Sequence, residues 1–68
     1  MTRREQLVQD GMLTIHQAEA FVGVKKSLLY KLMGNGELPF AKIGDRRLIP
    51  RRALTELAMD GLHGKNLE

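Results

Sequence analysis

Apolar residues recur at helical spacing soon after the start of the chain. Residues 15–22 place four apolar side chains on one face of a helix: Ile15, Ala18, Phe21 and Val22. Thr14 and Gln17 have the spacing of a capping box, in which each side chain accepts a hydrogen bond from the other residue's backbone N–H. Gly23 follows, and glycine commonly ends helices in the left-handed conformation. The pattern predicts a short helix over about 15–22.

A second helical pattern begins only a few residues later. Within residues 25–33, four apolar side chains share one face, which we expect to face the core: Leu28, Leu29, Leu32 and Met33. The sequence Gly34-Asn35-Gly36 then breaks the helix. Two short helices joined by a tight, glycine-containing turn are typical of a helix-turn-helix.

The second half of the chain changes from strand-like to helical spacing. Residues 40–43 and 46–49 are β-capable and flank Gly44-Asp45, which predicts a hairpin with a II′-like turn. Pro50 suits the first position of a further helix. The apolar stripe of this last helix, which ends near Asp60-Gly61, consists of Ala53, Leu54, Leu57 and Ala58.

These elements predict an α+β fold, mainly α: a small winged helix-turn-helix with two short helices, a two-stranded wing and a C-terminal helix. Residues 12–60 form this domain. Residues 1–11 form an N-terminal arm, in which Thr2 and Glu5 make another capping-box pattern, so a frayed turn or a short helix is expected. Residues 61–68 are polar and expected to be loose.

Composition narrows the class of protein. A chain of 68 residues forms one domain at most. No apolar run approaches the ~20 residues that a membrane-spanning helix needs, so no membrane partner is expected. The sequence has no cysteine, which excludes disulfides and thiolate metal sites and fits a reducing cytosol. The N-terminus has no apolar signal region, so we expect a cytoplasmic protein.

The net charge of +3 conceals an uneven distribution. Residues 24–52 hold eight basic and two acidic residues, a net +6. Residues 1–23 carry −1 and residues 53–68 carry −2. A basic excess concentrated on the second helix, the hairpin and the start of the last helix favours a nucleic-acid partner.

The second helix is expected to present Ser27, Tyr30 and Lys31 away from the core, and these groups can bond phosphates and base edges. Its N-terminal turn offers free N–H groups to an anion. In the hairpin, side chains alternate between the two faces, so one of the two tip arginines should share a face with Lys42. The alternative for each lysine is an ordinary solvated position. The candidate DNA-binding residues are Lys25, Lys26, Ser27, Tyr30, Lys31, Lys42, Arg46, Arg47 and Arg51.

The sequence shows no pattern that indicates catalysis. His16 and His63 have no acidic or histidine neighbours at ligand spacing, and no nucleophile–base pair stands out. The glycines lack the Lys-Ser/Thr ending of a phosphate-binding loop. We therefore expect no enzyme activity, no metal and no cofactor.

The order of these motifs resembles the excisionase-type helix-turn-helix family, small winged-helix domains related to the DNA-binding heads of mercury-resistance-type regulators. The resemblance covers about residues 12–58. It is carried by Leu13-Thr14-Ile15 through Ala18, Gly23-Val24, Ser27-Leu28-Leu29-Tyr30-Lys31-Leu32, Gly36-Glu37-Leu38-Pro39, Lys42-Ile43-Gly44-Asp45-Arg46-Arg47, and Ile49-Pro50 leading to Leu54. Three features depart from it: Lys25 stands where a small capping residue is usual, Asp45 where a basic wing residue is common, and Leu57 or Ala58 where an aromatic residue is often found near the end of the last helix.

The resemblance implies binding of double-stranded DNA, with the helix at 25–33 in the major groove and the wing at 40–49 on the backbone or in the minor groove. Members serve as recombination directionality factors of mobile elements, assisting an integrase or recombinase, or as small transcription regulators. A second class of function is a protein-interaction module that docks an integrase or a sister subunit through the C-terminal helix. We expect a monomer in solution, with cooperative binding on DNA implied by the resemblance.

Overall fold

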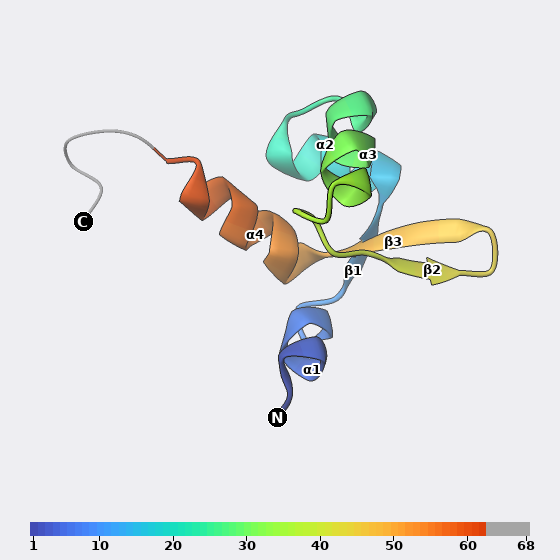
Figure 1. Ribbon diagram of the computed structural model, residues 1–68, viewed down its shortest axis with the longest axis vertical. Coiled ribbons are helices and arrows are strands. Elements are labelled where there is room, and N and C mark those ends of the chain that lie inside the picture. The colour runs from blue at the N-terminus through green and yellow to red at the C-terminus, as the bar shows by residue number, and fades with distance from the viewer. Residues whose placement is uncertain (63–68) are drawn as a thin grey trace.

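The computed structural model describes residues 1–62. Its arrangement is that of a small winged helix-turn-helix, mainly helical, as the sequence predicts (Figure 1). In chain order the elements are α1 (Arg3–Val8), β1 (Met12–Thr14), α2 (Ile15–Val22), α3 (Lys26–Gly34), β2 (Ala41–Ile43), β3 (Arg46–Pro50) and α4 (Arg51–Asp60).

The sheet contains a third strand that the sequence analysis missed. The antiparallel order is β1-β3-β2, so the expected hairpin of β2 and β3 gains β1 on its far side. Leu13 lies opposite Ile49, and the N–H of Arg51 donates to the carbonyl of Gly11 at 3.0 Å, one step beyond the ladder. Three residues beside a helix cap have no strand signature of their own, because only tertiary pairing makes them a strand.

The helices lie on both sides of this sheet. In Figure 1, α2 and α3 lie on one side of the sheet, α1 lies on the other, and the hairpin of β2 and β3 projects away from the helices. Apolar side chains of the strands and of α2, α3 and α4, together with Leu38 from the loop after α3, form one core. The buried set is Leu13, Ala18, Leu29, Met33, Leu38, Ile49, Ala53 and Leu54.

Local signals position α2 as predicted. The Thr14 hydroxyl accepts from the N–H of Gln17 at 3.1 Å, and the Gln17 side chain accepts from the N–H of Thr14 at 3.0 Å. Gly23 ends the helix with φ of 73°, in the left-handed region where a side chain is strained. The capping box and the glycine therefore fix both ends of the first helix of the helix-turn-helix.

Two core assignments were wrong in detail. Leu28 is 42% exposed, whereas Leu29 and Met33 are buried, so α3 is rotated relative to the expected face. Phe21, expected on the buried face of α2, is 48% exposed. Hydrophobic spacing gives a wide apolar stripe, but the element that packs on it decides which half is buried.

The N-terminal arm is ordered as α1 by contacts with α4. The guanidinium of Arg3 donates to both carboxylate oxygens of Glu56, and that of Arg52 donates to both oxygens of Asp10, at 3.0 and 3.3 Å. Arg52 and Glu56 are four residues apart on α4, but each is paired with a residue of the N-terminal arm. Pro50 is the cap residue before α4 rather than its first residue, because it still belongs to β3.

The pair between Arg3 and Glu56 predicts an acid-sensitive contact. Hydrogen bonding from Arg3 lowers the pKa of Glu56 below its ordinary value of 4.5. A carboxyl whose pKa falls on folding stabilises the fold above its unfolded pKa, and this contribution is lost as pH falls through the folded value. Glu56→Gln should therefore lower the Tm at pH 7, and the difference from wild type should vanish in acid below the folded pKa. Thermal unfolding followed by circular dichroism measures this, and a pH-independent difference would contradict it.

No helix within residues 1–62 is both long and apolar enough to span a bilayer. Of the tail expected to be loose, residues 63–68 lie outside the part of the chain that the structure describes.

Candidate nucleic-acid interface

All nine candidate DNA-binding side chains are exposed. Within residues 1–62, none of the seven basic residues among them takes part in an ion pair. Arg52, the remaining cation of the basic segment, is bound to Asp10. Within the described part of the chain, Arg52 therefore has an acidic partner, whereas the other seven cations of this segment are free to contact a polyanion. The seven available cations are Lys25, Lys26, Lys31, Lys42, Arg46, Arg47 and Arg51.

The wing turn has the predicted geometry. A II′ turn needs a positive φ at its first central residue and a negative φ at its second. Gly44, the first, has φ of 61°, and Asp45, the second, does not have a positive φ. Lys42 lies opposite Arg47, and Ile43 lies opposite Arg46. Opposed residues of an antiparallel pair share a face, so Arg47 is the arginine on the side of Lys42.

Arg47 connects the wing to α3. Its guanidinium carbon lies 5.3 Å from the ring centre of Tyr30 in α3 and 5.0 Å from that of Phe40, the residue before β2. Both distances are within the range of cation–π attraction. Phe40 is absent from the sequence-based candidates because an aromatic residue beside a strand reads as a packing residue.

The wing tip, α3 and the start of α2 surround one shallow depression of about 290 Å³. The contributing elements are far apart in the sequence, so their proximity is a property of the fold alone. Tyr30 and both tip arginines therefore belong to one surface, with Asp45 beside them. The lining residues are Thr14, Ile15, His16, Tyr30, Asp45, Arg46 and Arg47.

The start of α3 differs from expectation. Lys25 is the cap residue and provides no side-chain cap. The carboxylate of Glu19 in α2 accepts from the N–H of Lys26 at 2.8 Å. An acidic group thus already occupies the first free donor of the expected anion site, which compensates for the missing cap. The separation of seven residues across the turn follows no local motif.

His16 also differs from expectation, since it does have an acidic neighbour: its Nδ1 lies 4.0 Å from a carboxylate oxygen of Glu19. The imidazole is 97% exposed. Within residues 1–62, no three His, Cys, Asp or Glu side chains are grouped closely enough to hold a metal ion. His63 lies outside the described residues.

Arg51 is not brought to the wing or to α3. Its guanidinium carbon lies 5.7 Å from the ring centre of Phe21, at the end of α2. The two residues line a shallow hollow together with Leu13, Gln17 and Ala20. Arg51 thus lines a different hollow from the one that Tyr30 lines.

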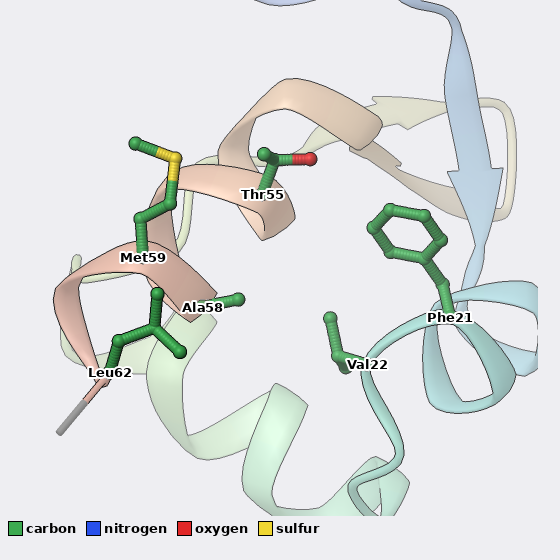
Figure 2. Close-up of a pocket in the computed structure, with 6 residues that line it drawn as sticks. All are labelled: Phe21, Val22, Thr55, Ala58, Met59 and Leu62. Atoms are coloured by element: carbon green, nitrogen blue, oxygen red, sulfur yellow. The ribbon is translucent and has the colours of Figure 1, made fainter. Parts of the chain in front are cut away.

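An apolar groove runs between α2 and α4 (Figure 2). Phe21 and Val22 line it from α2, Met59 lines it from α4, and Leu62 lines it from just beyond the end of α4. A second hollow, between α2, α3 and α4, includes Leu28 and shares Val22 and Ala58 with the first. The two hollows measure about 310 and 280 Å³.

A comparison with protein-family models identifies the family to which these elements belong. A model described as a helix-turn-helix domain matches residues 12–61, which is most of the chain. The chain belongs to this helix-turn-helix domain family. The match begins at β1 and runs through the wing and α4, so the family region contains every element that surrounds the depression, and α1 precedes it.

Membership in the helix-turn-helix family indicates DNA binding, and such domains are typically not enzymes. Comparisons with curated proteins and with solved structures found no significant match.

Proposed function

We propose that the chain binds specific double-stranded DNA sites of a mobile element, with α3 in the major groove. The observation that carries the proposal is the surface on which Tyr30, Arg46 and Arg47 meet, since α3 and the wing share it. Ser27 and Lys31 extend this surface along α3 and can reach base edges and phosphates. The wing then lies on the flanking backbone or in the minor groove.

Glu19 refines how α3 meets the duplex. The Glu19 carboxylate accepts a hydrogen bond from the N–H of Lys26, so a phosphate at the start of α3 would meet a negative charge. The side chains of Lys25 and Lys26 remain exposed there and carry two positive charges. We infer that lysine side chains, rather than the backbone of the first turn, hold the phosphates at this end.

Selection from a random duplex library tests sequence-specific binding. We expect one enriched motif, because specific contacts to base edges distinguish each base pair in the major groove. Alanine substitution of Tyr30 should relax the preference at one or two adjacent positions of the motif. Library members recovered without any enriched motif would contradict specific binding.

Two biological roles fit this activity: a recombination directionality factor that assists an integrase or recombinase, and a small transcription regulator. A recombination assay with a candidate integrase and its DNA sites, run with and without the chain, separates them. A directionality factor shifts the product ratio from integration toward excision, whereas a regulator leaves this ratio unchanged and alters transcription from a promoter that holds the selected motif.

A second candidate function is protein docking at the groove in Figure 2, where Met59 and Leu62 are 60% and 58% exposed. The adjoining hollow reaches Leu28 on α3, so the groove approaches the proposed DNA surface, and a second copy bound next to the first is the occupant we propose. The free chain should sediment as a monomer. Met59→Ser should reduce cooperativity on duplexes with tandem sites but not affinity for a single site. Unchanged cooperativity would exclude this occupant.

A further inference from the structure

The wing tip has little support from the sheet. β1 pairs with β3 only at Leu48, Ile49 and Pro50, so the hairpin beyond Leu48 consists of two strands alone. An isolated two-stranded hairpin is marginally stable in water. The helix α3 gives the wing little backbone support either, because it packs mainly on α2 rather than on the strands. The orientation of the tip relative to α3 therefore depends on side chains.

The cation–π contacts of Arg47 with Tyr30 and Phe40 provide that connection. Tyr30 comes from α3, Arg47 from β3 and Phe40 from the loop that enters β2, so one guanidinium joins three segments. A guanidinium that lies over an aromatic ring still has N–H groups that can donate to a phosphate or a base. A side chain that is already ordered loses less entropy on binding.

We propose that Phe40 is a positioning residue of the DNA interface, which fixes Arg47 and thereby the angle between the wing and α3. The inference rests on the proposed DNA-binding function. Phe40 is 39% exposed and has no polar side-chain atom to bond a phosphate or a base edge. Its contribution to affinity therefore passes through Arg47.

Phe40→Leu is the first test, because leucine keeps apolar bulk and removes the aromatic face. In the free chain, side-chain protons of Arg47 should show upfield ring-current shifts in NMR spectra. These shifts should decrease in Phe40→Leu and decrease further when Tyr30→Leu is added. Shifts unchanged by Phe40→Leu would show that the ring does not hold the guanidinium, and the proposal would fail without reference to DNA.

The second test is a double-mutant cycle on duplex affinity. Phe40→Leu should weaken binding about two- to five-fold, the size of one exposed cation–π contact. The slope of log affinity against log salt should stay at the wild-type value, because no phosphate contact is removed. In an Arg47→Ala background the same substitution should change affinity less than about 1.5-fold, because the coupled partner is gone.

Phe21→Leu is the matched control, since it removes the corresponding ring from Arg51. Its effect should be the same with Arg47 or Ala at position 47. Equal effects of Phe40→Leu in both backgrounds would overturn the positioning role alone, leaving DNA binding intact. Failure of the wild-type chain to bind any duplex would overturn the proposed function and this inference together.

Discussion

Replacing Lys31 and Arg46 together with alanine should lower duplex affinity about 100-fold at low salt. Each substitution removes an unpaired, exposed cation, one from α3 and one from the wing tip. Hydrogen bonds to charged groups contribute roughly 1.5–3 kcal/mol each, and two at the low end give about 3 kcal/mol. Fluorescence anisotropy with a labelled duplex measures the loss, and circular dichroism verifies that the variant is folded.

The matched control is the pair Arg3→Gln and Arg4→Gln, which removes two positive charges from α1; because Arg3 is bound to Glu56, circular dichroism verifies that this variant is also folded. This helix lies on the opposite side of the sheet from α3 (Figure 1). We expect less than about a three-fold change, from the reduced net charge alone. Equal losses in both double variants would mean that the duplex responds to total charge rather than to the surface around Tyr30.

Leu54→Ala should produce a large loss of stability. Leu54 is fully buried at the junction of α4 with the core, and removing a buried leucine side chain costs about 2–5 kcal/mol. A domain of this size has only about 3–10 kcal/mol of stability in total. We expect a substantially unfolded population at 37 °C, measured by urea unfolding followed by circular dichroism.

Met59→Ala, five residues further along α4, is the control for this substitution. Its side chain is 60% exposed, so the change should stay within about 0.5 kcal/mol. A Leu54→Ala midpoint close to that of wild type would contradict the assigned core.

Local chemistry predicted those parts of the fold whose partners are near in sequence. Thr14 and Gln17 cap the same helix turn, and Gly44 alone supplies the positive φ that the wing turn needs. Such signals act within a few residues, and they determine where elements start and turn. The helix-turn-helix and the wing were predictable for this reason.

Features that depend on distant partners were not predictable. β1 exists because residues 12–14 meet the end of β3. In the N-terminal arm, Arg3 of α1 is bound by Glu56 and Asp10 by Arg52, and both partners come from α4. Glu19 reaches α3 only because the turn brings two helices together at a particular angle. These contacts join residues of different segments, so a spacing rule that applies within one segment does not predict them.

The sequence predicted that the candidate residues are exposed, but not how the fold arranges them. The sequence-based candidates include Arg51 and omit Arg52, and the structure does place Arg52 in an ion pair, with Asp10 of the N-terminal arm. Alternation showed that only one tip arginine shares the face of Lys42, and only the strand register identifies it as Arg47. Phe40 lacked any charge or hydrogen-bonding group that would have marked it.

The central claim is that the cations of α3 and the wing bind a duplex together, and the salt dependence of affinity tests it most directly. For wild type, log affinity should fall linearly with log salt, with a slope of about −0.9 for each phosphate neutralised. The variant lacking Lys31 and Arg46 should have a slope shallower by about 1.8, corresponding to two lost contacts. A wild-type affinity that does not change with salt, or a variant with the wild-type slope, would contradict the claim.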